Sequence, residues 1–278
     1  MLETLRTADG LDLQLYVWDS ITGPLKATVA IVHGYGEHVA RYAHVAQAMN
    51  ARGIQVLGID LRGHGKSSGR RGAVLKFRDY HQDIDALLEA ARKRAKGSKL
   101  FILCHSMGGL ATFDYLLHGG GKDVAGVVSS SPFFGVALAV PQIKLAVGRL
   151  LSRYLPSLAI ASGIKGHHVT RDPVEAKKYE TDPLNNSKAN VRWYTEAMST
   201  IDSVLSRVSE IQLPILLVYG GADQLASASV TDRFAAGLKA PDRSIEKVEG
   251  GAHELVNDVS ETRTRIIGRM TDWVIEHA

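Results

Sequence analysis

The sequence predicts an α/β fold in which helices flank a mostly parallel central sheet, with a helical cap (lid) inserted between two of its strands. Two observations lead to this prediction. Short continuous apolar runs alternate with segments whose apolar residues recur at helical spacing, as expected for parallel strands joined by right-handed crossovers. This alternation stops over residues 132–212 and resumes afterwards, which is typical of an insertion above the strand ends.

The elements are predicted in order from the first residues. Segments 4–7 and 11–18 alternate apolar and polar side chains around Asp9-Gly10, which favours an opening β-hairpin. Apolar runs typical of strands covered on both faces follow at 27–32 and 54–59, and further strands are predicted at 100–103, 124–128, 215–219 and 244–248. Helical spacing predicts helices over 42–52, from residue 80 to a closing glycine at 97, and over 109–118, 230–238 and 260–276.

The interruption divides the chain into two regions. We expect an α/β core made of residues 1–131 and 213–278, and a cap made of residues 132–212. The cap contains one apolar stripe, which could form the wall of an apolar tunnel or could pack the cap onto the core; the sequence favours neither. The same stripe could also contact the surface of a membrane. The stripe contains Ile143, Val147, Leu150 and Tyr154, with Arg149 and Arg153 on the opposite side.

The composition restricts the class of protein. Of 278 residues, 45% are hydrophobic and 22% charged, which is ordinary for a globular domain, and the single cysteine excludes an internal disulfide. The first residues contain no continuous apolar segment, so we expect no signal peptide, no membrane span and a cytoplasmic location. The net charge of +4 is accompanied by no nucleic-acid-binding motif, so we expect no nucleic-acid partner.

The most informative stretch is KLFILCHSMGGL, residues 99–110. An apolar run ends at Ser106, and small residues then begin a helix, so the serine lies at a tight strand-to-helix corner. This is the pattern of a nucleophile elbow, usually written G-x-S-x-G, in which the turn exposes a serine hydroxyl. Cys104 stands at the first glycine position, where we interpret it as a buried packing residue rather than a reactive thiol.

Two further candidates follow predicted strands and come directly after glycines. Asp223 lies in YGGADQL after strand 215–219, and His253 lies in EGGAHEL after strand 244–248. Because parallel strands end at the same edge of a sheet, we expect both side chains near Ser106. The sequence therefore predicts a triad in which Ser106 is the nucleophile, His253 the base and Asp223 the acid that orients the base.

An oxyanion would need two hydrogen-bond donors beside this serine. One is expected from the backbone N–H of Met107, directly after the serine and at the positive end of a helix. The other is expected from the N–H of Tyr35, because the glycines of HGYG let the loop after strand 27–32 approach the elbow.

Two other patterns are interpreted as structural. Gly65-Lys66-Ser67 is similar to the end of a phosphate-binding loop, but Asp60 stands where the first glycine belongs, so we expect no nucleotide. His33, Glu37 and His38 do not have the helical H-E-x-x-H spacing of a zinc site, so we expect no metal there.

Together these motifs make the chain resemble the monoacylglycerol lipase and lysophospholipase group of the α/β-hydrolase superfamily, related to its serine aminopeptidase branch. The resemblance extends over nearly the whole chain. It rests on HGYGEHVARY (33–42), DLRGHGKSSGRRG (60–72), HSMGG (105–109), the cap stretches RDP and DPL (171–173 and 182–184), and the loops of Asp223 and His253.

The resemblance implies an α/β-hydrolase fold and a serine carboxylic ester hydrolase that needs no metal or organic cofactor. It implies a small-molecule acyl ester or lipid as substrate, an acyl-enzyme on Ser106, and most closely a monoacylglycerol lipase. A lysophospholipase or short-chain carboxylesterase with the same triad is the alternative, and a binding protein of this fold without activity is a further one. The acyl chain, the head group, the oligomeric state and the pathway are left open.

Overall fold

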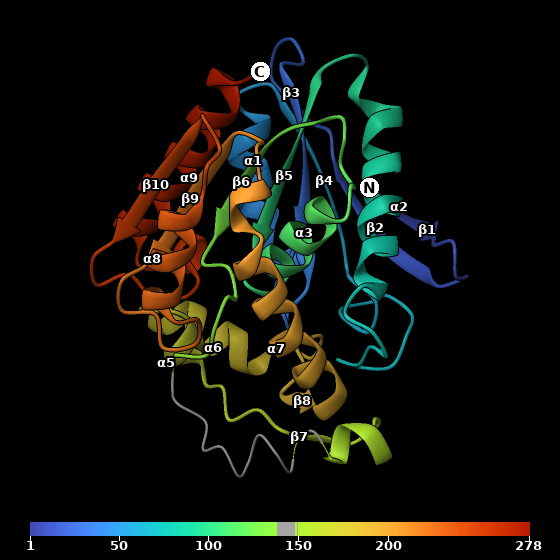
Figure 1. The fold of residues 1–278 in the computed structure, drawn as a ribbon. Helices are drawn as coiled ribbons and strands as arrows, with labels where there is room; N and C mark the ends of the chain where they lie inside the picture. Colours follow the sequence, from blue (N-terminus) through green and yellow to red (C-terminus); the bar gives the residue numbers. More distant parts are fainter. Residues whose placement is uncertain (138–147, 149) are drawn as a thin grey trace.

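An eight-stranded sheet with helices on both faces forms the centre of the computed structural model, which describes residues 1–137, 148 and 150–278 (Figure 1). The strand order is β1-β2-β4-β3-β5-β6-β9-β10; β2 pairs antiparallel with both β1 and β4, and all the other neighbouring strands pair parallel. The predicted α/β fold, a mostly parallel central sheet flanked by helices, is thus confirmed. The strands are β1 (Leu2–Arg6), β2 (Asp12–Trp18), β3 (Ala27–Val32), β4 (Ile54–Ile59), β5 (Lys99–His105), β6 (Val124–Ser130), β9 (Ile215–Gly220) and β10 (Arg243–Val248).

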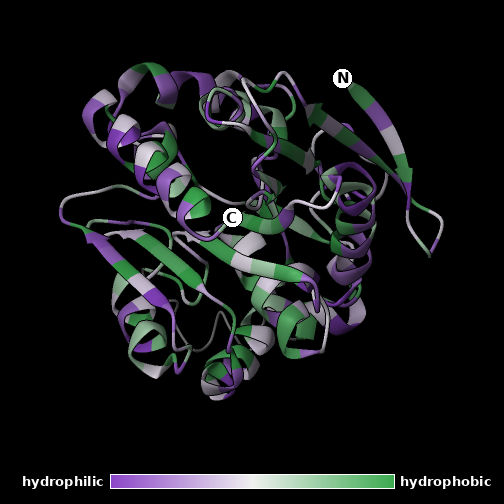
Figure 2. Cartoon of the chain, turned by 90° about the horizontal axis from the view of Figure 1, so that it is seen from above, coloured by the Kyte–Doolittle hydropathy of each residue, from purple (hydrophilic) through white to green (hydrophobic). Residues whose placement is uncertain are grey.

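Two hydrophobic cores separate the helices from the two faces of the sheet. Helices α1 (Ala43–Asn50) and α9 (Ser260–Glu276) pack against one face, whereas α2 (Asp79–Ala95), α3 (Met107–Leu117) and α8 (Ala228–Gly237) pack against the other. Every residue of the central strand β3 is buried, because its alternate side chains enter the two cores in turn. Burial on both faces explains why the sequence of such a strand is a continuous apolar run. In Figure 2 the strands in the middle of the sheet are hydrophobic, whereas the helices have hydrophilic residues on their outer surfaces.

The predicted bounds are close to those observed. The expected helix 42–52 is observed as a short 3₁₀ segment, η1 (Val39–Tyr42), followed by α1, and the chain turns at Gly53, where φ is +85° and a side chain would be strained. Elsewhere the largest differences are of two residues: β1, α3 and α8 begin two residues before their predicted starts, and β5 and β6 end two residues after their predicted ends. Within the described residues, none of the helices has the length and apolar character needed to cross a bilayer.

The segment between β6 and β9 lies outside the main sheet and contains more than the predicted helices. A small antiparallel sheet of β7 (Ala159–Ala161) and β8 (Lys188–Asn190) accompanies them. The helix α7 packs on α3 through an apolar face, whereas α6 has no buried residue. After a helical stretch over 150–154, the helical elements are α5 (Gly166–Val169), α6 (Pro173–Thr181), α7 (Val191–Ser206) and the 3₁₀ segment η2 (Val208–Glu210); another 3₁₀ segment, η3 (Leu255–Asn257), follows β10.

The apolar stripe predicted in the cap is described only in part. Ile143, Val147 and Arg149 lie outside the described residues. Leu150 and Tyr154 are 59% and 68% exposed. These two side chains therefore do not pack onto the core. For Leu150 and Tyr154, packing of the cap onto the core is thus not the explanation of the stripe.

The parallel register brings the ends of the central strands to one edge of the sheet. Val32 at the end of β3 pairs with Cys104 of β5, and Val248 at the end of β10 pairs with Gly220 of β9. The loops that follow these strands are consequently neighbours, and they carry the predicted site residues.

Candidate active site

The turn between β5 and α3 holds Ser106 in an unusual backbone conformation. Its φ is +51° and its ψ is −118°, values that residues with a side chain rarely adopt. Backbone bonds fix the turn: the Ser106 N–H donates to the Ser130 carbonyl at 3.1 Å, and the Ser106 carbonyl accepts from Phe133 at 3.0 Å. The strain is therefore held by the neighbouring strand, as in a nucleophile elbow.

Two glycines allow the chain to approach this turn closely. A Cβ on Gly108 would lie 2.2 Å from the Val32 carbonyl oxygen, so only glycine fits there. A Cβ on Gly34 would lie 3.1 Å from the Cβ of Ser106, which places the HGYG loop against the serine. The glycine of the elbow motif is thus required because a larger side chain would clash with neighbouring backbone. Cys104, at the first position of the motif, is fully buried in the core on the α3 side of the sheet.

His253 and Asp223 form a buried pair, as predicted. His253 Nδ1 lies 2.6 Å from Asp223 Oδ2, and the other oxygen of the carboxylate accepts from the N–H groups of Leu225 and Ala226. A Cβ on Gly220 would lie 2.3 Å from the Ala252 carbonyl, so this glycine lets the two loops meet. The geometry fixes the histidine with Nδ1 on the carboxylate and Nε2 free for another partner.

The electrostatics distinguish His253 from its neighbour His105, whose ring centroid lies 4.7 Å away. Burial lowers the pKa of His253, but the negative charge of Asp223 and its hydrogen bond outweigh this effect and raise the pKa above 6.5. Burial and the nearby His253 instead lower the pKa of His105, which bonds the Ser130 carbonyl through Nδ1 at 3.0 Å. His253 is therefore the histidine suited to accept a proton.

Ser106, His253, Tyr35 and Met107 all line one cavity of about 320 Å³. No hydrogen bond joins the Ser106 hydroxyl to His253 in the part of the chain that the structure describes, and such contacts often tighten only when substrate binds. Met107 is the first residue of α3, where backbone N–H groups lack partners inside the helix. The four predicted residues are thus brought to one cavity, with Asp223 behind His253.

The cavity wall is mostly apolar and comes largely from the segment between β6 and β9. This segment contributes Phe133, Ile164, Val169 and Trp193 among other residues. An apolar cavity of this size with a few polar groups at one place is typical of a small-molecule site.

A charged network at the cavity was missed by sequence reasoning. Arg41 lies 2.8 Å from Glu37 and 2.6 Å from Glu254, and both glutamates line the cavity. The Gly34 N–H donates to Glu37 at 2.7 Å, so the network also fixes the HGYG loop. Glu37 and Arg41 are the charged residues of HGYGEHVARY, and their i,i+4 spacing was the signal that could have identified the pair.

Trp193 of α7 contacts both residues expected to supply oxyanion donors. Its indole N–H donates to the Met107 sulfur at 3.2 Å, and its ring centroid lies 3.8 Å from that of Tyr35. The Tyr35 hydroxyl in turn lies 2.8 and 3.0 Å from the carbonyl oxygens of Gly72 and Lys188, which share its one proton as acceptors. The cap therefore fixes the position of side chains on both sides of Ser106.

The two patterns interpreted as structural bind groups of the protein itself. The Lys66 N–H donates to the Asp60 carboxylate at 2.8 Å, so the Gly65-Lys66-Ser67 loop encloses an internal acid. His33 Nε2 accepts from Leu61 at 2.9 Å, and His38 Nε2 lies 2.9 Å from Asp182.

Comparison with known proteins agrees with this geometry. The chain matches the family model of serine aminopeptidase S33 hydrolases over residues 23–260. It is 27% identical to the monoacylglycerol lipase of Mycolicibacterium smegmatis, over 96% of this chain and 94% of that protein. It is 28% identical to phospholipase YtpA of Bacillus subtilis, over 84% and 89%, and it spans 29% of a longer abhydrolase domain-containing protein of Dictyostelium discoideum.

A solved structure supports the same family assignment. The monoacylglycerol lipase of Paleococcus ferrophilus superposes with a TM-score of 0.84 at 28% identity, covering 95% of this chain and 99% of that one. The chain belongs to the serine aminopeptidase S33 family of the α/β-hydrolase superfamily, in the group of that superfamily that contains the monoacylglycerol lipases.

Proposed function

We propose that this protein is a carboxylic ester hydrolase, most closely a monoacylglycerol lipase, that cleaves an acyl ester through an acyl-enzyme on Ser106. The observation that carries the proposal is the buried His253–Asp223 pair at 2.6 Å, facing the same cavity as the strained Ser106 turn. The relatives named as lipases support hydrolysis of a small-molecule ester.

The proposed mechanism follows from the roles that the geometry permits. His253 Nε2 takes the proton of Ser106 as Oγ attacks the ester carbonyl, and Asp223 stabilises the imidazolium that forms. The N–H groups of Tyr35 and Met107 donate to the oxyanion. The C–O bond to the alcohol breaks as His253 returns the proton to the leaving oxygen. Water then attacks the acyl-enzyme with His253 again as base, which releases the acid and restores Ser106.

The cavity supports an ester with an apolar acyl group. Ile164, Val169 and Trp193 offer an apolar wall to a hydrocarbon chain, and the Glu37–Arg41–Glu254 network offers polar groups at the same cavity. A monoacylglycerol combines these two characters in one molecule.

Substitution of the nucleophile tests the proposal. Ser106→Ala should lower kcat on p-nitrophenyl esters and monoacylglycerols by about 10⁶-fold while leaving the circular dichroism spectrum unchanged. The matched control is Ser131→Ala, because Ser131 is a buried serine with φ of +42° directly after the neighbouring strand β6, and this variant should keep its activity. Turnover by Ser106→Ala near the wild-type rate would refute the acyl-enzyme on this residue.

The alternative substrates use the same residues and differ in the alcohol that leaves. The similarity to a protein named as a phospholipase favours including lysophosphatidylcholine beside monoacylglycerols and esters from acetate to palmitate. The ratio of kcat/KM values across this panel decides between the lipase, the lysophospholipase and the short-chain esterase. A protein inactive on all of them that also fails to react with a fluorophosphonate would be a binding protein instead.

We also propose that the cap contacts membranes peripherally when substrate is collected. Leu150, Tyr154 and Leu155 are each more than half exposed, and Arg153 lies among them in the sequence. Cosedimentation with anionic liposomes at low salt should be reduced by Leu150→Asp and Tyr154→Asp. Equal sedimentation of wild type and variants would exclude this surface.

A further inference from the structure

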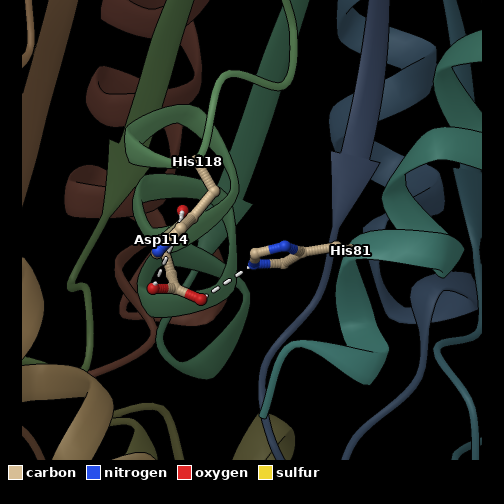
Figure 3. Close-up of side chains that lie close together, drawn as sticks. All are labelled: His81, Asp114 and His118. Atoms are coloured by element: carbon tan, nitrogen blue, oxygen red, sulfur yellow. Dashed lines mark hydrogen bonds and ion pairs between the residues drawn. The ribbon is translucent and has the colours of Figure 1, made fainter.

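Three side chains that the proposed hydrolysis does not use meet on the outer side of the fold. His81 comes from α2, Asp114 from α3, and His118 directly follows α3 (Figure 3). Each oxygen of the carboxylate faces one histidine: Oδ2 lies 2.8 Å from His81 Nε2, and Oδ1 lies 3.3 Å from His118 Nδ1. One potential ligand atom from each residue falls within 4.8 Å of the other two.

We propose that His81, Asp114 and His118 bind a divalent transition-metal ion of the zinc class, at a site separate from the hydrolase centre. Two imidazoles and one carboxylate are among the ligand sets that zinc takes in proteins, with water completing the coordination. The proposal identifies these residues as a site that links α2 to the end of α3.

The spacing of the donor atoms suits such an ion. Zinc–ligand distances of about 2.0–2.1 Å in tetrahedral geometry place neighbouring ligand atoms about 3.3 Å apart. The observed separations of 2.8 and 3.3 Å run to different oxygens of the Asp114 carboxylate, and one potential ligand atom from each residue lies within 4.8 Å of the other two, so small side-chain shifts would bring three donors around one ion. Asp114 and His118 stand at i,i+4, the spacing that brings two side chains to one face of a helix, and His81 supplies the third ligand from the facing helix.

Burial and charge also favour a cation here. The Asp114 side chain is only 3% exposed, so its negative charge is held in place, while the His81 and His118 side chains are 15% and 25% exposed and give an ion access from solvent. The site lies at the C-terminal end of α3, where the helix dipole favours positive charge.

One neighbour competes with the metal. Arg78 Nη2 lies 2.6 Å from His118 Nε2, and His118 Nδ1 lies 2.7 Å from the Asp114 carbonyl, so both ring nitrogens of His118 are in use. An ion bound to His118 must replace one of these two bonds, and the guanidinium charge repels it. Arg78→Gln should consequently strengthen metal binding.

Zinc titration of metal-stripped protein by calorimetry tests the site. Wild type should bind one zinc ion per chain at this site, and Co²⁺ should give the visible absorption bands of a low-symmetry site. Loss of an outer-shell partner already costs about 10- to 100-fold in affinity, so His81→Ala and His118→Ala should each weaken binding by at least about tenfold. Ser106→Ala should bind zinc like wild type, which separates this test from that of the hydrolase mechanism.

The matched control is the double variant His167→Ala/His168→Ala, which removes an adjacent histidine pair with ring centroids 4.1 Å apart in the cap. It should bind zinc with unchanged affinity. Circular dichroism melting without metal establishes that each variant is folded, and His81→Gln replaces His81→Ala if the latter is not. Wild-type affinity and stoichiometry in the His81 and His118 variants, or no saturable binding by wild type at millimolar zinc, would overturn the proposal.

Discussion

The two walls of the cavity are built in different ways. The core wall comes from loops that end parallel strands, and its residues Ser106 and His253 are 8% and 4% exposed and held by backbone bonds and a buried ion pair. Apart from α7, the cap wall comes from short elements, among which α6 buries no residue and β7 and β8 have three residues each. Under the proposed function, the core would hold the reacting groups in place and the cap would determine which substrate reaches them.

The two walls are nevertheless joined at a few places. His38 of the HGYGEH loop pairs with Asp182 of the cap at 2.9 Å, and the Asn186 N–H donates to the Gly36 carbonyl at 2.8 Å. Trp193 makes the most direct connection, because it touches both Tyr35 and Met107. From this comparison we expect substitutions in the core wall to lower kcat and most substitutions in the cap wall to change KM. Substitution of Trp193 should change both.

After loss of the Ser106 nucleophile itself, the largest effect is expected for the acid that lies behind His253. Asp223→Asn removes the charge that fixes and stabilises His253, and should lower kcat by about 10⁴-fold. Stopped-assay kinetics on one ester measure this, with Asp232→Asn as the control because Asp232 pairs with Lys247 near the surface. A loss smaller than tenfold in Asp223→Asn would contradict the assigned role.

The pH profile tests the same wall without changing the substrate contacts. The neutral form of His253 is the base, and its pKa is raised above 6.5 because the Asp223 carboxylate outweighs the effect of burial. Below that pKa the histidine is protonated, so kcat/KM should fall about tenfold per pH unit, with the midpoint above pH 6.5. The remaining activity of Asp223→Asn should have its midpoint at lower pH. A flat profile between pH 4 and 8 would exclude a histidine base.

Trp193→Leu tests the connection between the walls. Loss of its contacts with Met107 and Tyr35 should misplace the oxyanion donors and reduce kcat by up to about 100-fold. Tyr194→Leu is the matched control, because Tyr194 is the next residue on α7 and also lines the cavity; it should change KM rather than kcat. If both variants change only KM, Trp193 belongs to the cap wall alone.

The smallest effect on activity is expected at Cys104. Cys104→Gly restores the usual elbow pattern but removes a side chain that is fully buried in the core, so the free energy of unfolding should fall by about 1–2 kcal/mol. Urea denaturation measures this change, and kcat/KM should stay within about threefold of wild type. A gain of stability would mean that the sulfur is strained in this site.

The strands and site residues of the core could be predicted from the sequence, whereas the short elements and contacts of the cap could not. Strands such as β3 and β9 are covered on both faces, so their apolar runs stand out, and parallel pairing then determines which edge Asp223 and His253 share. Trp193 and Glu254 acquire their roles only through contacts between distant segments, which no local pattern records. The three-residue strands β7 and β8 are too short to show an alternation.

The backbone at Ser106 also limits how stable this protein can become. With φ at +51°, any residue other than glycine keeps an unfavourable conformation at this turn, at a cost of about 1–3 kcal/mol. A glycine there would relieve that cost and remove the hydroxyl in the same step, whereas alanine would remove the hydroxyl and keep the cost. As long as selection retains the nucleophile, no substitution at this position can raise the stability of the protein. Stabilising substitutions must therefore occur elsewhere in the fold.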